Sequence, residues 1–365
     1  MATASLDAQE RPPNRPPLAS SADTNDWEAY YDQGVEWLNL RRQTRAEAAF
    51  YWASRLDPRR AEPLFARWAT EWARDADRFD RYLRHDPKKP LPDEMVRIDS
   101  LRYRAFLRNP LVFEGLIMAA YQELPGRWRN DAWTEAWIAY GTLEFDKALA
   151  SFARALSRDP ERYGEAHYLR ATTYVAMGKL DSAATELDML LGLLRQRESQ
   201  QLSPIYESKA LLYYAVGLLE GARGHPAAAR TGLERALLED LSFYPAHIAL
   251  GQLPLGQRDQ AAALKEFEQA AGLAGTDAVA RYEYGVALIR AQRHAEAATE
   301  LRAAVALEPY FADPYYWLGE ALLAQHDSAA ALSAVESYVA RASGRAPSLG
   351  AARQRLALLK PKQEE

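Results

Sequence analysis

The sequence predicts an all-α protein built as a solenoid, in which helical hairpins stack side by side. Three observations predict this fold class. Four glycines recur at a spacing of 34 residues, at Gly217, Gly251, Gly285 and Gly319. Alanines and larger apolar residues follow each glycine at constant offsets. Each period also divides into two stretches with apolar residues at helical spacing, and a proline such as Pro309 stops the second stretch.

The residues at constant offsets predict how the two helices of a hairpin pack. Two antiparallel helices that approach closely need Gly or Ala where they cross, while larger residues fill the flanking grooves. A single hairpin leaves one apolar face open, so we expect each unit to stack on its neighbours and to make local contacts only. The alanine columns are Ala229, Ala263, Ala297 and Ala331, then Ala236, Ala270 and Ala304 with Tyr338 in the last unit; between them stand Leu233, Phe267, Leu301 and Val335.

This 34-residue helix–turn–helix pattern resembles the tetratricopeptide repeat family. The resemblance rests on the spacing above, on Tyr284 or Leu318 just before the glycine, and on Pro309 at the end of a unit. It implies a right-handed α-solenoid whose first helices line a concave groove that holds a peptide or helix of a partner protein.

Seven stretches carry the pattern. The first has Gly34 and Phe50 at the expected offsets, and the second has Ala136 and Phe152. In the third, Leu190 replaces the second small residue. The predicted units are 27–60, 129–162, 164–197, 210–243, 244–277, 278–311 and 312–345.

Residues 61–128 keep the phase of the repeat but match it poorly. Trp68 and Arg102 stand where small residues are expected, which argues against close helix packing there. The stretch from Arg55 to Arg129 is rich in arginine. Two interpretations remain open: divergent helical repeats with a solvated charged face, and an insertion that forms a specialised docking surface.

The two ends have different characters. Residues 1–26 contain the polyproline-like motif RPPNRPP, which is a potential proline-rich ligand, and we expect a disordered, solvated tail. In 346–360, Leu349, Ala352, Leu356 and Leu359 share one helical face. A helix of that kind is expected to cap the last repeat.

Composition and motifs exclude several classes of chemistry. The 365 residues include no cysteine, so disulfides, thiol catalysis and thiolate zinc sites are excluded. No phosphate-binding, metalloprotease or nucleophile-elbow motif is present, and the six histidines are scattered. We therefore expect no enzyme activity, no cofactor and no metal site. A net charge of -5 argues against nucleic acid as a partner.

Targeting signals are also absent from the sequence. The longest apolar run, 210–219, is shorter than the ~18–20 residues that span a bilayer, and the N-terminus has no apolar core of signal-peptide length. We expect a cytoplasmic protein without membrane insertion.

Aromatic residues mark the candidate partner-binding site. If the first helices line the groove, helical phase directs these side chains into it. Trp133 and Trp137 are one helical turn apart and costly to expose, whereas each tyrosine is equally compatible with a scaffold role. The candidate residues are Trp133, Trp137, Tyr140, Tyr168, Tyr214, Tyr282, Tyr316 and Trp317.

These observations predict a non-catalytic scaffold or adaptor that binds a peptide or helix of another protein. The inner face offers no cluster of Lys, Asn and Arg for a terminal carboxylate, so an apolar or mildly basic helical segment is the expected ligand. Two alternatives remain. One is a homodimer that assembles through the N-terminal half, which holds eight of the nine tryptophans. The other is an enzyme or RNA-binding protein with a divergent site in 61–128.

Overall fold

The structure is a computed structural model of the chain. Every regular element in the residues that it describes is a helix, so the prediction of an all-α fold is confirmed. Contacts divide the chain into two compact units, each described by itself below. Unit 1 takes Met1–Val35, Ala48–Arg59 and His247–Glu365, and unit 2 takes Glu36–Glu47 and Arg60–Ala246. The described residues are 12–83, 85, 89–121, 132–160, 163–200, 208–253 and 260–360.

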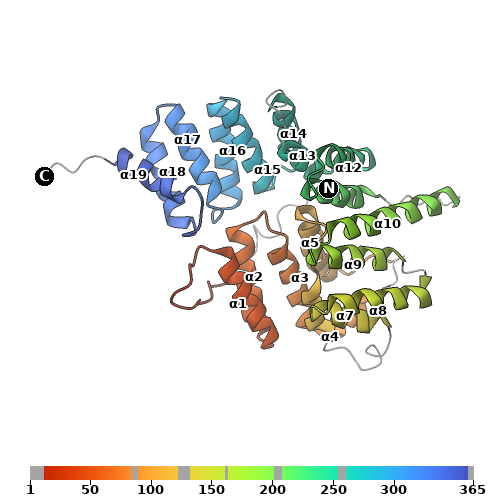
Figure 1. Ribbon diagram of the computed structural model, residues 1–365. Coiled ribbons are helices and arrows are strands. Elements are labelled where there is room, and N and C mark those ends of the chain that lie inside the picture. Colours follow the sequence, from red (N-terminus) through yellow and green to blue (C-terminus); the bar gives the residue numbers. More distant parts are fainter. Residues whose placement is uncertain are drawn as a thin grey trace. The chain divides into compact units, whose positions relative to one another are not determined.

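Most helices fall in one unit, and three cross the boundary between the units. Those that cross are α1 (Trp27–Asn39), α2 (Gln43–Leu56) and α13 (Tyr244–Gln252). Unit 1 holds α14 (Gln260–Leu273), α15 (Ala278–Arg290), α16 (His294–Leu307), α17 (Asp313–Ala324), α18 (Ser328–Arg341) and α19 (Leu349–Leu359) (Figure 1). Unit 2 holds α3 (Glu62–Ala73), α4 (Ala76–Leu83), α5 (Asp93–Arg108), η2 (Gly115–Ile117), α6 (Met118–Tyr121), α7 (Ala132–Gly141), α8 (Phe145–Arg158), α9 (Tyr163–Ala176), α10 (Leu180–Gln200), α11 (Ala210–Ala222) and α12 (Pro226–Glu239).

The repeated glycines mark where the two helices of a hairpin touch. A Cβ atom added to Gly285 would lie 2.7 Å from Cγ of Leu301, the apolar residue sixteen positions later on the paired helix. No side chain fits at that separation, so the glycine permits the close approach. The same contact joins Gly217 to Leu233, Gly251 to Phe267, Gly319 to Val335 and Gly34 to Phe50. Close packing at the glycine column is confirmed.

The turn inside the hairpins also repeats. The residue two positions before the second helix has a positive φ in several units, and glycine takes that position at Gly178 (φ 72°) and Gly224 (φ 79°). Non-glycine residues adopt the same left-handed conformation elsewhere, which costs free energy because Cβ crowds the carbonyl oxygen. They are Arg41 (φ 57°), Leu143 (φ 62°), Gln292 (φ 60°) and His326 (φ 64°).

We expect Leu143→Gly to stabilise unit 2 by about 0.5–1 kcal/mol, because relief of the left-handed strain exceeds the added entropy of the unfolded chain. Little packing is lost, since Leu143 is 62% exposed. The midpoint of urea unfolding measures the effect. Gly224→Ala is the matched control: its new Cβ would meet nothing within 4 Å, so it should destabilise by about 1 kcal/mol through φ alone. A lower midpoint for Leu143→Gly would contradict the assignment.

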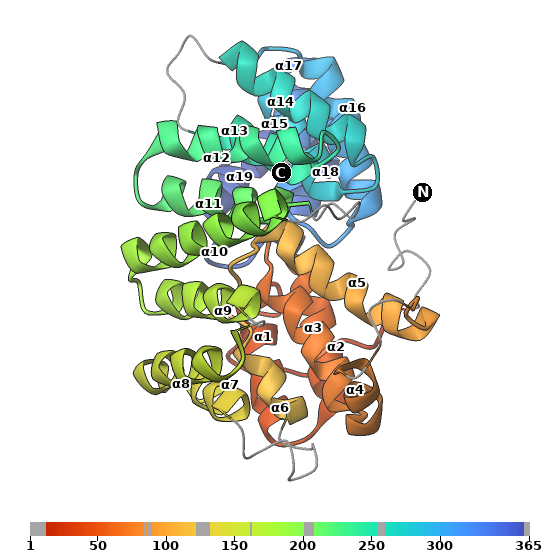
Figure 2. The ribbon, with the colours of Figure 1, turned by 90° about the vertical axis from the view of Figure 1, so that its right-hand side faces the viewer.

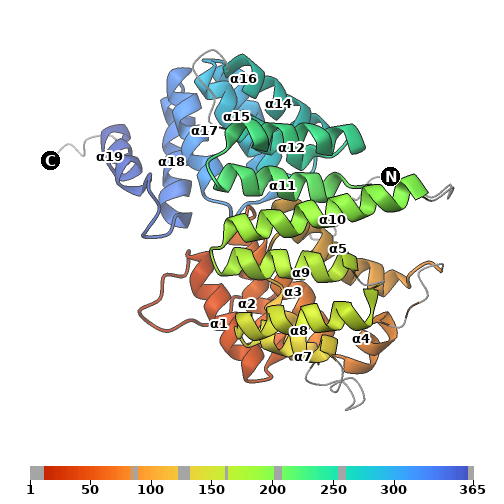
Figure 3. The same ribbon diagram turned by 45° about the vertical axis from the view of Figure 1, so that its right-hand side comes forward.

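In unit 2 the hairpins from α7 to α12 follow one another, as Figure 3 shows. Helix α3 packs on α4, α5 and α6 (Figure 2). The two large residues in place of small ones pack on each other, because the Arg102 guanidinium lies 5.0 Å from the centre of the Trp68 ring. Trp68 is 4% exposed, so close packing is kept in this divergent stretch by a different pair of residues.

The expectation of local contacts only is wrong in unit 1. The first hairpin contacts the loop between α16 and α17, far along the chain. The rings of Trp52 and Tyr310 meet edge to face at 4.8 Å, and Arg55 pairs with Glu308 at 2.7 Å. Arg59 pairs with Asp313 at 2.9 Å. The repeat pattern does not record these contacts because the residues that make them are not in its columns.

Residues 12–26 of the expected disordered tail over 1–26 make specific contacts in the structure, while residues 1–11 lie outside the described part. The Asn25 amide donates to the carbonyl of Ala340 at 3.0 Å, and Arg345 pairs with Asp26. These polar contacts hold the segment against unit 1.

Helix α19 has the place expected of a capping helix. Leu349 and Ala352 are buried in a cluster with Tyr315, Val335 and Tyr338 of the last repeat. On the polar side of α19, Arg355 forms an ion pair with Glu320 at 3.0 Å. The helix thus covers the apolar side of the final hairpin and presents charge on its own outer side.

Candidate functional site

The two tryptophans of α7 lie inside unit 2. Trp133 and Trp137 are each 7% exposed, and both rings meet Phe152 of α8, at 5.9 and 6.3 Å between centroids. The paired helix of the same hairpin therefore covers both rings. Their role in binding a partner stays a prediction.

The three candidate tyrosines that lie in unit 2 form hydrogen bonds with the chain's own backbone. Tyr168 of α9 donates its hydroxyl to the carbonyl of Pro110 at 2.5 Å, and Tyr214 of α11 donates to that of Leu107 at 3.3 Å. The hydroxyl of Tyr140 on α7 accepts from the Glu114 N–H at 3.0 Å. Residues 107–114, which follow α5, therefore lie along the first helices of three successive repeats.

A buried ion pair anchors this internal segment. Glu114 is 1% exposed, and one of its carboxylate oxygens accepts from Nε and Nη2 of Arg102 at 3.0 and 2.9 Å. Burial raises the pKa of Glu114, and the Arg102 charge opposes that rise. Burial also raises the pKa of Tyr168 well above its usual value. Neutral tyrosine hydroxyls remain donors to the backbone over the physiological pH range.

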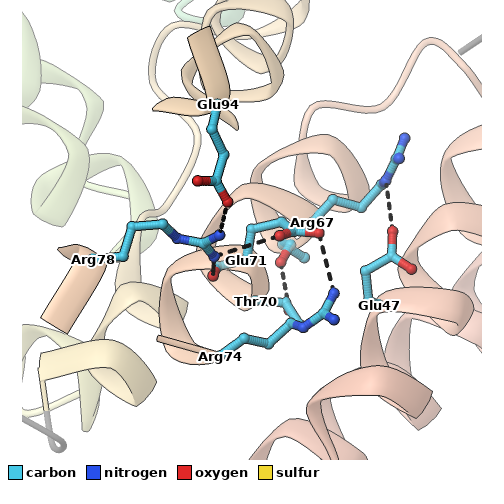
Figure 4. Close-up of polar contacts among 8 residues, drawn as sticks. Glu47, Arg67, Thr70, Glu71, Arg74, Arg78 and Glu94 are labelled. Atoms are coloured by element: carbon cyan, nitrogen blue, oxygen red, sulfur yellow. Dashed lines mark hydrogen bonds and ion pairs between the residues drawn. The ribbon is translucent and has the colours of Figure 1, made fainter. Parts of the chain in front are cut away.

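Three arginines in or next to α3 and α4 form ion pairs within unit 2, as Figure 4 shows. Arg78 is 9% exposed and pairs with Glu94, and Arg67 is 3% exposed and lies 3.5 Å from Glu47. The more exposed Arg74 reaches Glu71 at 3.4 Å. The interpretation of a solvated charged face is wrong for Arg67 and Arg78. Their positive charge is matched inside unit 2.

Tyr282 of α15 lies in a buried corner of unit 1. It is 8% exposed, and its ring meets that of Phe311 at 5.1 Å. The Arg59 guanidinium lies 5.0 Å from the Phe311 ring and pairs with Asp313. Burial raises the pKa of Asp313, and Arg59 opposes the rise. Tyr282 is thus covered by the end of the first hairpin.

Tyr316 and Trp317 differ from the other candidates because both are only half-buried. They lie on α17, with ring centroids 5.3 Å apart. Burial raises the pKa of Tyr282, and the nearby Trp317 side chain on α17 opposes the rise. We call Glu283 of α15 together with Tyr316, Trp317 and Glu320 of α17 the α15–α17 face.

The α15–α17 face carries two carboxylates in different states. Glu320 forms a two-bond ion pair with Arg355, at 3.0 and 3.2 Å. Glu283 accepts one hydrogen bond from the Gln252 amide at 3.0 Å, and no described cation lies within ion-pair distance of it. Burial raises the pKa of Glu283, and the Gln252 hydrogen bond and the charges of Arg59 and Arg290 oppose the rise. A partly buried carboxylate with one hydrogen bond and no direct ion pair favours an incoming cation.

Sequence reasoning missed the segment 107–114 and the role of Arg59. Pro110 is a usable signal, since it ends α5 at Arg108 and starts an extended stretch whose carbonyls are free to accept hydrogen bonds. No comparable signal marks Arg59, whose partners lie on a distant repeat.

No group of three or more His, Asp or Glu side chains in the described ranges is placed to hold a metal ion. None of the described helices combines the length and the apolar character needed to cross a membrane.

Comparisons with known proteins agree with this architecture. The model of the tetratricopeptide repeat family matches residues 144–203. No curated protein matches the sequence. The matched stretch runs from the start of α8 through α10 and is similar to tetratricopeptide repeats.

Solved structures of similar fold share little sequence with this chain. The Cut9–Hcn1 hetero-tetramer of the APC/C is 14% identical, covering 92% of this chain and 76% of that one, with a TM-score of 0.47. YrrB, described as a TPR protein with an unusual peptide-binding site, is 20% identical over 57% of this chain and 100% of that one, with a TM-score of 0.43. MamA of Desulfovibrio magneticus RS-1, from residue 41 onward, is 17% identical over 49% and 94%, with a TM-score of 0.41.

Proposed function

We propose that the chain is a non-catalytic scaffold or adaptor that binds a segment of another protein on the α15–α17 face. One observation carries the proposal: Tyr316 and Trp317 are half-buried, whereas the candidates of unit 2 are occupied by the chain itself. Trp and Tyr supply much of the binding energy at protein interfaces. A half-buried pair of such rings is held in place and still has surface to bury.

The charge of the face defines the partner's chemistry. Glu283 lacks an ion pair among the described residues, and Glu320 shares its charge with Arg355. A Lys or Arg of the partner can pair with Glu283 while its stem lies on the Trp317 ring. The proposed ligand is therefore an apolar, mildly basic segment, without a requirement for a free terminal carboxylate.

The alternatives have less support. Six tryptophans of the N-terminal half are at most 7% exposed within the chain, which leaves them little surface for a homodimer: Trp37, Trp52, Trp68, Trp72, Trp133 and Trp137. The buried, paired arginines Arg67 and Arg78 offer little charge to RNA phosphates. Light scattering and a titration with single-stranded RNA test these two alternatives directly.

A peptide-display selection on the full-length chain tests the proposal. We expect selected segments to be enriched in aromatic or aliphatic residues next to Lys or Arg. Trp317→Ala should weaken their binding about 30-fold or more, the size of an interface hot spot. Calorimetry with synthetic peptides measures the loss.

A matched control distinguishes binding at the α15–α17 face from non-specific hydrophobic binding. Leu238→Ala removes a large apolar residue that is 82% exposed elsewhere, and it should leave affinity unchanged. Equal binding of the selected peptides to wild type and Trp317→Ala, with both variants folded by circular dichroism, would refute the assignment.

A further inference from the structure

The N-terminal segment 12–18 holds most of the RPPNRPP motif and is seated on unit 1. It has no helix or strand. Pro13 and Pro16 are half-buried, whereas the residues between and beside them are exposed. A spacing of three between buried positions is the repeat of a polyproline II helix, and proline fixes φ near the value of that conformation. The spacing of Pro13 and Pro16 is therefore that of a polyproline II ligand.

The surface beneath it is aromatic. We call Tyr30, Trp52 and Tyr310 the Trp52 surface. The indole Nε1–H of Trp52 donates to the carbonyl of Pro13 at 3.0 Å, and Leu18 packs against the same cluster. A polyproline II helix makes no internal hydrogen bonds, so its carbonyls are free to accept from such a donor. Aromatic-lined grooves are the usual receptors for proline-rich segments.

Arg15 adds a second element of recognition. Its guanidinium lies 4.6 Å from the centre of the Trp52 ring and 5.6 Å from that of Tyr310. Arginine over the face of tryptophan is a favourable cation–π arrangement. The guanidinium also donates to the carbonyl of Thr24 at 3.1 Å, which sets its direction. The Trp52 surface thus contacts Pro13 and Arg15, and Pro16 is half-buried beside them.

We propose that the Trp52 surface is a recognition site for an arginine-containing, proline-rich segment of another protein, and that residues 12–18 occupy it as a built-in competitor. Residues 12–18, the part of the tail before the polar contacts of Asn25 and Asp26, are held on the Trp52 surface by one indole hydrogen bond, one stacked guanidinium and Leu18. A partner segment of the same chemistry supplies all three contacts. The Trp52 surface and the α15–α17 face share no residue, so failure of one proposal leaves the other standing.

A substitution that weakens the contacts of residues 12–18 with the Trp52 surface, made in the full chain, tests the proposal. Arg15→Glu removes the stacked cation from an exposed position and leaves the Trp52 surface intact. The probe is a fluorescent peptide of residues 10–20, ERPPNRPPLAS, followed by anisotropy. We expect it to bind the Arg15→Glu chain about tenfold more tightly than wild type, because a tethered competitor acts at an effective concentration near millimolar. The same peptide with alanine in place of its second arginine should bind more weakly.

Two variants in the Arg15→Glu background define the surface. Trp52→Phe keeps a ring and removes the donor, so peptide affinity should fall several-fold. Leu273→Ala changes an apolar residue that is 46% exposed elsewhere in unit 1 and should have no effect. Equal affinity for wild type and Arg15→Glu, or no binding to either, would overturn the proposal, and this comparison does not depend on the folding of Trp52→Phe. A wild-type dimer that Arg15→Glu converts to a monomer would also overturn it, in favour of tails exchanged between two copies.

Discussion

Arg102→Met should lower the free energy of unfolding of unit 2 by about 3–5 kcal/mol, the loss typical when a buried ion pair loses one partner. Glu114 is 1% exposed and would remain as a buried carboxylate without its cation. The substitution keeps the length of the side chain, so its contact with Trp68 is largely preserved. Urea unfolding followed by circular dichroism measures the change.

The pH dependence of this variant has a definite sign. Burial raises the folded-state pKa of Glu114, so folding favours the protonated carboxyl. This preference stabilises the folded state below the ordinary pKa of glutamate. The stabilisation is lost as pH rises through the raised folded-state pKa of Glu114. Without the opposing Arg102 charge the loss is larger, and Arg102→Met should be relatively more stable at pH 5 than at pH 8.

Neutralising the unpaired Glu114 carboxylate of this variant provides the control. Arg102→Met combined with Glu114→Gln should recover much of the lost stability, because a neutral amide costs less to bury than a carboxylate. A single variant as stable as wild type, or a double variant no better than the single, would contradict the account of this pair.

Gly285→Leu should destabilise unit 1 by about 1–3 kcal/mol or more and lower its melting temperature. A Cβ at this position would meet Leu301 Cγ at 2.7 Å, so the two helices of the hairpin must separate. Differential scanning calorimetry measures the shift.

The same substitution in a neighbouring helix separates overpacking from helix propensity. Gly272 lies in α14, and a Cβ there would meet nothing within 4 Å. Gly272→Leu should therefore be neutral or stabilising, because leucine is a better helix former than glycine. Equal melting temperatures for the two variants would show that the glycine column does not set the helix separation.

The hairpins were predictable because their packing depends on residues that are close together in the sequence. Gly285 and Leu301 are sixteen residues apart and touch directly, and the same pair recurs along the chain, so a periodic pattern reveals both the helices and their contact. The capping helix is equally local, since Leu349 and Ala352 pack on the hairpin just before them.

The candidate site was less predictable because the segment that covers a helix face can come from a distant part of the sequence. The phase of α7 identifies Tyr140 as a face residue, but the backbone of Glu114 that covers it comes from a stretch without the repeat pattern. Arg59 covers Tyr282 for the same kind of reason, from a hairpin far earlier in the chain. Helical phase therefore predicts the direction in which a side chain points. Whether that side chain is exposed depends on the non-repeating segments that are available to cover its helix face.

Unit 1 also imposes an order on biosynthesis. Residues of the first hairpin such as Trp52 and Arg55 leave the ribosome about 250 residues before Tyr310 and Glu308, with which they pack. Nascent chains therefore carry an unfinished aromatic surface while the hairpins of unit 2 are synthesised and can already fold. Assembly of unit 1 waits until Tyr310 and Glu308 have emerged, and general chaperones that shield exposed aromatic surface would act during that interval.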